Sequence, residues 1–224
     1  PSQFGFEPCY VNSRLVSRGI PVACEVDIYG ALSEYIGMCA SDDTVTLLDI
    51  NNSVPKYIYD EDIVGKYGYK LTDTFMGFHC GNTPQCKMCS NRKIKYQLIQ
   101  NRLLENCGEP DFTRGTLEGD IAASDITFYR LQCDSQGVLR SYIAEGEVLD
   151  VPTRSFGGIG IFAIPEMGRF YRHVLIQKGY PHHGAVAFSH VGKTLFEVFK
   201  YLGVKDIAYN QPKSLPYPTE NPFA

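Results

Sequence analysis

Two acidic side chains near the start of the chain stand where charge is unexpected. Glu25 and Asp27 lie two positions apart, between the apolar runs 20–23 and 31–32. Charges in such surroundings are costly unless they have a partner, bind a metal ion or shift their pKa values. Carboxylates of this kind can hold a cation or act as general acid and base. The plainer interpretation is that Asp27 caps the helix that follows while Glu25 is exposed.

A group of histidines lies near the other end of the chain. His182, His183 and His190 are three of the five histidines. Neutral imidazole is a common metal ligand, and with the two carboxylates it would give a mixed oxygen and nitrogen set that suits Mn²⁺ or a similar ion. Adjacent side chains on a strand point to opposite faces, so we expect at most one of His182 and His183 to reach a given ion. A polar turn with a hydrogen-bonded core histidine is the alternative.

A third motif contains thiols. Cys86 and Cys89 form a C-x-x-C pair, and Cys80 or His79 could complete a structural zinc site. No second C-x-x-C is present, so free thiols in a loop are the alternative. The glycine-rich segment 154–161 lacks the spacing of a nucleotide-binding loop. Glycines in a strand-rich region more often mark a bulge or a close backbone approach.

Composition limits the class of protein. The 224 residues are 44% hydrophobic and 21% charged, which excludes wholesale disorder and collagen-like repeats. The net charge of −4 gives no basic footprint for nucleic acid, and no apolar run approaches the ~20 residues that span a bilayer. The first residues show no secretory leader, so we expect reduced thiols and a cytoplasmic location. Because no Met begins the chain and motifs start at once, we also expect a larger N-terminal part to be missing.

The elements that must position these side chains follow from periodicity. Apolar residues from Ile28 to Ile36 recur at helical spacing, with Gly37 near the expected end of the helix. Strands that succeed one another, a hairpin and helices near the ends favour an α+β fold with an antiparallel sheet or barrel. The segment 91–106 fits a helix or a strand. The other expected elements are strands at 44–50, 69–78, 125–133, 138–149, 185–188 and 207–209, and helices at 165–179 and 191–202.

Three segments resemble the L-fucose isomerase family: 7–15 (EPCYVNSRL), 19–32 (GIPVACEVDIYGAL) and 181–192 (PHHGAVAFSHVG). The resemblance implies an aldose–ketose isomerase that uses a divalent ion, usually Mn²⁺. It also implies the end of an α/β domain (1–41), a β-rich C-terminal domain with an antiparallel β-barrel and flanking helices (42–210), and a Pro-rich tail (211–224). The implied partners are a sugar substrate, the missing N-terminal domains and further copies of the chain in a homo-oligomer.

The resemblance also assigns roles to single residues. Asp27 matches the metal-binding Asp of the family's Glu-x-Asp, His183 matches its metal-binding His, and His182 then contacts sugar. The family's other Glu follows a Pro-Cys pair, and no acid follows Cys9 here before Leu15. We therefore expect Glu25 and Asp27 to be the catalytic acids, with Glu25 as a further metal ligand.

The chemistry fits these residue types. Isomerising an α-hydroxy aldehyde moves a proton between neighbouring carbons, which a carboxylate can do, while a metal that holds both sugar oxygens stabilises the enediolate. The alternative is a non-catalytic sugar- or zinc-binding module for structure or oligomerisation, which the missing Glu favours.

Overall fold

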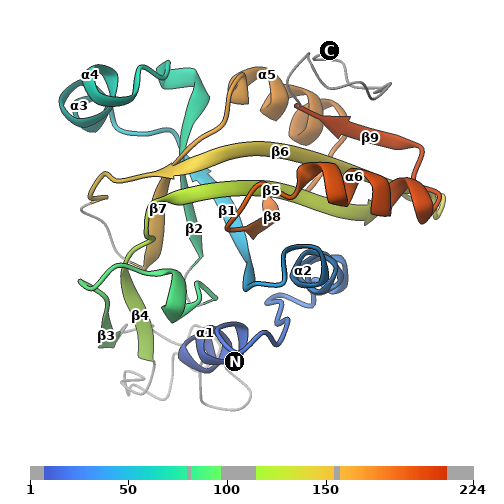
Figure 1. The fold of residues 1–224 in the computed structure, drawn as a ribbon, viewed down its shortest axis with the longest axis horizontal. Helices are drawn as coiled ribbons and strands as arrows, with labels where there is room; N and C mark the ends of the chain where they lie inside the picture. The colour runs from blue at the N-terminus through green and yellow to red at the C-terminus, as the bar shows by residue number, and fades with distance from the viewer. Residues whose placement is uncertain (1–7, 80–81, 97–114, 154–156, 211–224) are drawn as a thin grey trace, which may run out of the picture.

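The computed structural model describes residues 8–79, 82–96, 115–153 and 157–210 (Figure 1). Its strands are β1 (Val45–Asn52), β2 (Thr74–His79), β3 (Lys93–Tyr96), β4 (Gly115–Asp120), β5 (Ser124–Cys133), β6 (Leu139–Leu149), β7 (Gly158–Ala163), β8 (His183–Ala187) and β9 (Asp206–Tyr209). Its α-helices are α1 (Cys9–Val16), α2 (Ile28–Ser41), α3 (Lys56–Ile58), α4 (Val64–Tyr67), α5 (Met167–Tyr171) and α6 (Gly192–Tyr201). Short π and 3₁₀ segments occupy Tyr59–Ile63, Leu71–Asp73, Gln85–Lys87 and Arg172–Gln177.

The described strands form one sheet in the order β3-β4-β7-β2-β1-β8-β5-β6-β9. A further pairing between β6 and β7 closes β7-β2-β1-β8-β5-β6 into a ring whose neighbours are all antiparallel. β4 and β9 are added in parallel to β7 and β6. The expected α+β class is confirmed. The expected antiparallel barrel stays a prediction, because these pairings define only a ring of strands.

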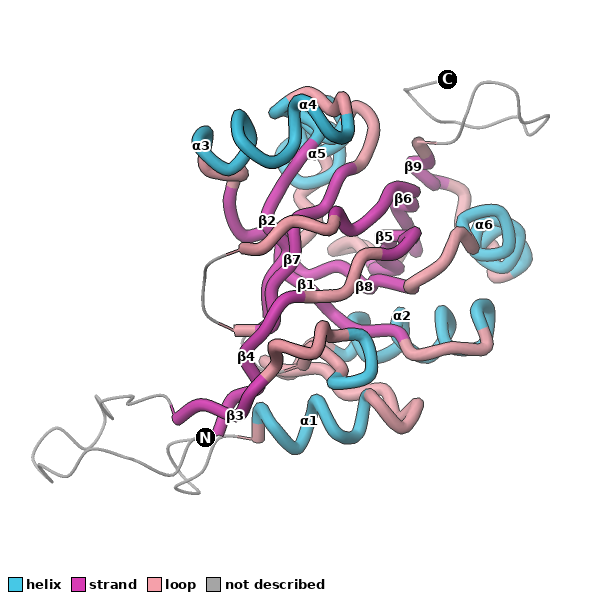
Figure 2. Tube along the Cα trace, turned by 60° about the vertical axis from the view of Figure 1, so that its left-hand side comes forward, coloured by secondary structure: helices cyan, strands magenta, loops and turns pink. Residues whose placement is uncertain are grey.

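Helices α2 and α6 lie along one side of the sheet (Figures 1 and 2). α2 packs on β1, β5 and β8, and α6 packs on β6 and β9. Side chains of β5 alternate between two clusters: Ile126 and Phe128 face the other side of the sheet, whereas Tyr129 and Leu131 face the helices. Each such large side chain that is fully buried contributes about 1.5–3 kcal/mol. The cluster on the helix side, against which Ile36 and Met38 of α2 pack, fixes α2 over the strands that carry the candidate site.

Helix α2 is longer than its sequence pattern predicts. It continues through Gly37 to Ser41 and ends at Asp42, which has a left-handed φ of 52°. A Cβ at position 37 would lie 1.6 Å from the Tyr129 hydroxyl oxygen. Gly37 therefore allows a close approach of α2 to β5 instead of ending the helix.

Most of the other expected elements are found. The hairpin of β5 and β6 pairs in register as far as Cys133 and Leu139. The expected strand at 69–78 begins later, at Thr74, because a 3₁₀ turn precedes it. The expected helix at 165–179 is a short α-helix followed by a π segment.

The buried strand β7 was not expected from its sequence. All of its residues are buried, so the polar and apolar alternation that predicts a strand is missing. A Cβ on Gly158 would lie 2.4 Å from the Thr83 hydroxyl oxygen, which agrees with the expectation of a close backbone approach in this segment.

Some sequence predictions fall on residues outside the described ranges: Cys80, most of the ambiguous segment 91–106, residues 154–156, and the proline-rich tail 211–224. Within the described part of the chain, no helix has the length and apolar character needed to cross a membrane.

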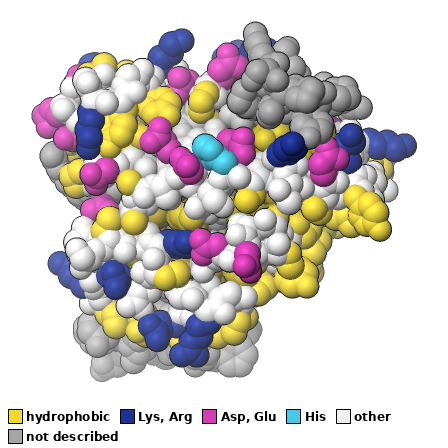
Figure 3. Space-filling model, in the orientation of Figure 1, with side chains coloured by type: hydrophobic (Ala, Val, Ile, Leu, Met, Phe, Trp, Pro, Cys, Tyr) yellow, Lys and Arg dark blue, Asp and Glu magenta, His cyan; other side chains and the backbone are white. Residues whose placement is uncertain are grey.

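On the face in Figure 3, acidic and basic side chains are interspersed and apolar side chains gather around α2 and α6. Exposed apolar residues on these helices include Ile28 (72% exposed), Tyr35 (58%) and Tyr201 (91%).

Candidate metal and acid–base site

The centre of the candidate site is a cross-strand pair. β1 and β8 run antiparallel, and Asp49 stands opposite His183 in their register. Partners in such a pair have their side chains on the same face of the sheet. The Nε2 atom of His183 lies 3.0 Å from Oδ1 of Asp49. The His183 side chain is 6% exposed and that of Asp49 is 22% exposed, so the pair lies just below the surface.

Helix α2 brings a second carboxylate to the same histidine. Asp27 is the N-cap of α2 and accepts a hydrogen bond from the backbone N–H of Gly30 at 2.8 Å. Its Oδ2 atom also lies 3.3 Å from Nδ1 of His183, across 156 positions of the chain. A Cβ at position 30 would lie 2.5 Å from Oδ2 of Asp27, so the approach requires glycine. Asp27 is thus both the expected helix cap and a member of the histidine cluster.

Arg130 of β5 holds Asp27 from the other side. This arginine is buried, and its Nη2 and Nη1 atoms donate to the two carboxylate oxygens of Asp27 at 2.6 and 2.8 Å. Paired hydrogen bonds of this kind are strong and fix orientation. Nη1 also donates to the backbone oxygen of His183 at 3.1 Å, and Nε donates to Gln132 at 3.0 Å. One guanidinium group therefore links the carboxylate of α2 to the strand that carries the histidine.

Asp27 and His183 shift each other's pKa in opposite directions. Burial alone would raise the pKa of Asp27, but hydrogen bonds from His183 and Arg130 hold it well below its usual range. The hydrogen bond to Asp27, followed by the contact with Asp49, raises the pKa of His183 to about 9, against the effect of burial. At neutral pH these contacts favour an ionised Asp27 and a protonated His183.

Glu25 approaches the pair from the solvent. Its side chain is 70% exposed, and its Oε2 atom lies 3.8 Å from Nε2 of His183. Glu25 and Val26 form a turn with φ values of 59° and 60°. A β-branched residue such as Val26 rarely adopts this left-handed conformation, and backbone strain of this kind is concentrated at functional sites.

His182 lies next to Asp49 as well. Its Nε2 atom is 3.7 Å from Oδ1 of Asp49, and its ring centroid is 4.4 Å from that of His183. One ligand atom from each of Asp49, His182 and His183 can be chosen so that all lie within 4.8 Å of one another. Both histidines reach the same carboxylate, contrary to the expectation from strand alternation, because β8 begins only at His183. The buried ring of His79 lies beside them, 5.9 Å from the His183 ring between centroids.

A second carboxylate of α2 holds the surrounding backbone. Glu34 is fully buried and accepts hydrogen bonds from the backbone N–H groups of Val22 at 2.7 Å and Leu47 at 2.9 Å. Burial raises the pKa of Glu34 to about 8, although both hydrogen bonds act to lower it. Glu34 thus ties the segment before Glu25 and the strand before Asp49 to the same helix.

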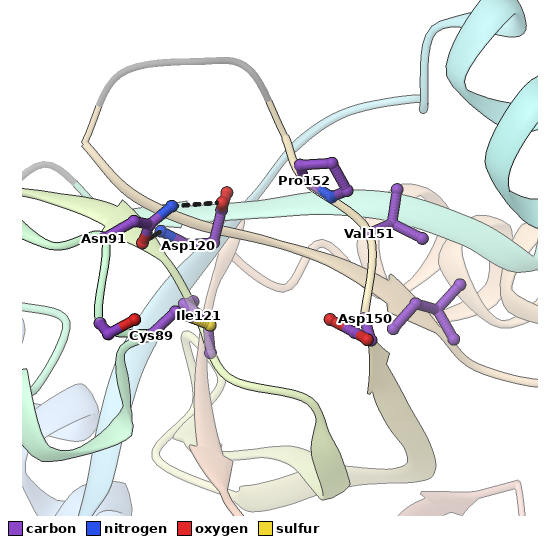
Figure 4. A pocket seen from close by; sticks show the side chains of 9 residues that line it. Cys89, Asn91, Asp120, Ile121, Asp150, Val151 and Pro152 are labelled. Atoms are coloured by element: carbon purple, nitrogen blue, oxygen red, sulfur yellow. Dashed lines mark hydrogen bonds between the residues drawn. The ribbon is translucent and has the colours of Figure 1, made fainter.

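One thiol of the C-x-x-C pair, Cys89, lies at another pocket. Cys89 lines a cavity of about 260 Å³, in which Asn91 donates a hydrogen bond to Asp120 at 2.8 Å (Figure 4). Burial raises the pKa of the Cys89 thiol, whereas Cys86 is exposed. Within the described ranges, neither thiol belongs to a group spaced to hold a metal ion. Because Cys80 lies outside those ranges, the zinc interpretation stays a prediction.

Asp49 and Arg130, which contact Asp27 or His183, were not identified from the sequence, although each has a recognisable sequence signal. Asp49 is the acid within the apolar strand 44–50, at the same parity as Val45 and Leu47. Arg130 is a cation within the apolar run of β5. A charge inside a strand that is otherwise buried requires an opposite charge or a ligand nearby.

Comparisons with known proteins support the resemblance seen in the sequence. Residues 77–209 match the family model described as L-fucose isomerase, C-terminal domain, which is more than half of the chain. The chain is also 24% identical over 204 residues to a sulfoquinovose isomerase of Alkalicoccus urumqiensis. That alignment covers 88% of the chain but 39% of the relative, so the chain spans well under half of the relative's length. The family match includes His183 and begins after Asp27 and Asp49.

Proposed function

We propose, from the premise that this chain belongs to the L-fucose isomerase C-terminal domain family, that it is part of an aldose–ketose isomerase that depends on a divalent metal. The family and the relative both point to a sugar isomerase. The metal dependence, the proton-transfer chemistry and the sugar class are our proposal. The observation that carries it is the meeting of His183 with Asp27, Asp49 and Glu25, all within 4 Å of its ring nitrogens.

The residues present fit a divalent cation. Oδ1 of Asp49 is buried and has no hydrogen bond of good geometry within the described part of the chain, which leaves an acceptor available. Imidazole nitrogens and carboxylate oxygens together suit ions such as Mn²⁺. A divalent ion bound here would polarise the sugar oxygens and stabilise negative charge that develops on them. In this proposal His183 supplies a nitrogen ligand and nearby carboxylates supply oxygens.

In this proposal Glu25 moves the proton. Its exposed carboxylate lies on the solvent side of His183, where a substrate can approach, and its position on a turn leaves the side chain accessible. A carboxylate in this place can take a proton from one carbon of the sugar and return it to the next. Asp27 lies behind the ring, where it orients His183 with the help of Arg130. The sugar contact of His182 stays a prediction.

The remaining parts of the enzyme belong to the proposal as well. Because the chain spans 39% of its relative, we include further N-terminal domains and a second subunit among its partners. The apolar side chains exposed on α2, among them Ile28 and Tyr35, support a contact with further protein beside the site. The division of the chain at residue 41 is proposed on the resemblance, and a cytoplasmic location on the expectation of reduced thiols.

The test is deuterium incorporation during turnover. The natural protein that contains this chain is incubated in D₂O with Mn²⁺ and a panel of aldoses that includes L-fucose and sulfoquinovose, and products are followed by NMR. We expect a ketose that carries solvent deuterium on the carbon next to its carbonyl. Glu25→Gln should slow this exchange by about 10²–10⁴-fold, the usual contribution of a general base.

Glu166→Gln is the matched control, because Glu166 is 57% exposed and pairs with Arg169 on the surface. It should leave turnover unchanged. Isomerisation without any deuterium would contradict proton transfer through Glu25. Binding of a sugar without isomerisation of any aldose in the panel would favour the non-catalytic module instead.

A further inference from the structure

His79 is a buried histidine that the proposed function does not use. It is the last residue of β2, and it stands opposite Gly158 of β7 in the register of the sheet. Its ring lies beside the candidate site, with its centroid 5.9 Å from that of the His183 ring and the two planes tilted by 41°. His79 is 4% exposed and is therefore buried as deeply as His183.

The two ring nitrogens of His79 differ in their partners. Nδ1 accepts a long hydrogen bond, of 3.4 Å, from the backbone N–H of Asn82. A nitrogen that accepts carries no proton, so the proton of the neutral ring is on Nε2. Nε2 has no hydrogen bond to a described residue, and it is not among the fully buried unpaired atoms of the described ranges. Part of this donor is therefore open to a ligand.

Asn82 holds the ring in this arrangement. This residue is fully buried, and its Nδ2 atom donates to the backbone oxygen of Val22 at 2.7 Å. Its own backbone oxygen accepts from the Thr46 hydroxyl at 3.1 Å. The residue that fixes the tautomer of His79 is thus tied both to the segment before the acidic turn and to strand β1. A donor supported in this way is oriented before a ligand arrives.

A donor without a partner selects for an acceptor. A buried N–H group that stays unpaired lowers stability, and an oxygen atom in hydrogen-bond reach removes that cost. Three carboxylates, those of Glu25, Asp27 and Asp49, meet at the neighbouring ring of His183. Their negative charge disfavours an anionic acceptor beside them. The uncharged oxygen atoms of a sugar meet both requirements.

We propose that His79 is a substrate-contact residue, whose Nε2–H donates a hydrogen bond to an uncharged oxygen atom of the bound sugar. The inference rests on the proposed function for the identity of the ligand. It is separate from cation binding, because the group spaced to hold an ion within the described ranges does not include His79. An analogue that lacks the contacted oxygen would leave the donor unpaired and would be rejected. His79 would therefore contribute to the choice among aldoses.

The first experiment reads the contact without catalysis. The natural protein that contains this chain is labelled with ¹⁵N-histidine and studied by NMR with Mg²⁺, which is diamagnetic, and with the alditols of the aldose panel, which cannot isomerise. Without alditol, the His79 ring should carry a proton on Nε2 and none on Nδ1. An alditol that binds should shift the Nε2–H resonance more than the Nδ1 resonance. A proton on Nδ1, or a bound alditol that leaves both resonances in place, would overturn the proposal.

The second experiment compares two variants. His79→Phe keeps a planar ring without a donor, whereas His79→Gln keeps an N–H group near the position of Nε2. His79→Phe should lower kcat/KM by about 10–100-fold, chiefly through KM, and His79→Gln should recover most of the loss. The loss should be absent for the monodeoxy aldose that lacks the contacted oxygen.

His173→Gln is the matched control, because the His173 ring lies 3.2 Å from the side chain of Gln177, four residues later. It should leave kcat/KM unchanged. Equal kcat/KM for His79→Phe and the unmodified protein on every aldose would contradict the contact, as would a loss that His79→Gln does not reduce. The NMR experiment uses the unmodified protein and does not depend on the folding of any variant.

The contact and the proposed function can fail separately. Isomerisation by a protein whose His79 resonances ignore a bound alditol would refute the contact and leave the proposed function. A shifted Nε2–H resonance in a protein that isomerises no aldose would refute the proposed function and leave a sugar contact at His79.

Discussion

Asp27 caps α2 and Glu34 lies within it, and the two carboxylates have partners of opposite kinds. Asp27 meets the guanidinium of Arg130 and the imidazole of His183. Glu34 accepts hydrogen bonds from two backbone N–H groups, and no cationic side chain is among its described partners. Burial pushes both pKa values upward. The pKa of Asp27 is nevertheless held well below its usual range, whereas that of Glu34 is raised to about 8.

The difference separates a carboxylate that is held ionised beside His183 from one that only holds the backbone. An ionised Asp27 favours an N–H on the nitrogen of His183 that faces it. A neutral Glu34 fixes α2 against the neighbouring backbone without adding charge to the interior. The two carboxylates, one 12% exposed and the other fully buried, therefore differ in charge because their partners differ.

The largest effect is expected from removing the cation that keeps Asp27 ionised. Arg130→Gln leaves the carboxylate of Asp27, which is 12% exposed, with His183 but without its guanidinium partner, which should lower the free energy of unfolding by up to about 3–5 kcal/mol. Urea denaturation followed by circular dichroism measures this change. The double variant with Asp27→Asn should recover part of the loss, because no unpaired charge is then buried. If Arg130→Gln were as stable as the unmodified protein, pairing with a cationic side chain would not distinguish Asp27 from Glu34.

A smaller, pH-dependent effect is expected at Glu34. The native pKa of this acid is raised from 4.5 to about 8, so its contribution to stability is complete below pH 4.5 and is lost as the pH rises through about 8. Glu34→Ala leaves two buried N–H groups without an acceptor and should cost about 2–4 kcal/mol at pH 5. The difference from the unmodified protein should shrink by pH 8. It is measured as the difference in unfolding free energy at each pH, which cancels groups common to both proteins.

A difference that stays constant from pH 5 to pH 8 would show that Glu34 is ionised in the folded protein. Asp27 and Glu34 would then differ in the arrangement of their hydrogen-bond partners and not in their own charge.

The smallest effect is expected for a carboxylate at the surface. Asp60 pairs with Lys56 four residues earlier, and their side chains are 50% and 77% exposed. Lys56→Ala should change the free energy of unfolding by no more than about 0.5 kcal/mol, because water screens such pairs. A larger loss of stability, measured by thermal denaturation, would mean that solvent exposure does not make this ion pair weaker than the buried ones.

The parts of the fold that sequence predicted well are those with local signals. The turn at 134–137 and the apolar alternation around it gave the β5–β6 hairpin, and spacing gave α2 and α6. β7 was missed because its residues are all buried and two of its described neighbours in the sheet, β2 and β4, are distant in sequence. Gly37 was misread as the end of a helix because only the packed structure shows Tyr129 beneath it.

The site residues also divide into those with a local sequence motif and those without one. Glu25, Asp27, His182 and His183 were found because motifs carry them, and the structure brings them together. Asp49 and Arg130 carry no motif, and their importance depends on which strands are neighbours. β1 pairs with β8, and Arg130 of β5 contacts the N-cap of α2. No local sequence pattern encodes either contact.

The direct pairing of Asp49 with His183 also makes the site a reporter of folding. A slip of one residue between β1 and β8 would turn one of these side chains to the opposite face of the sheet. An intermediate in which β8 has not yet joined β1 therefore lacks the pairing of these two side chains. Since a ligand stabilises only the state that binds it, a divalent ion bound at this pair would favour the chain with its strands in register over misaligned alternatives.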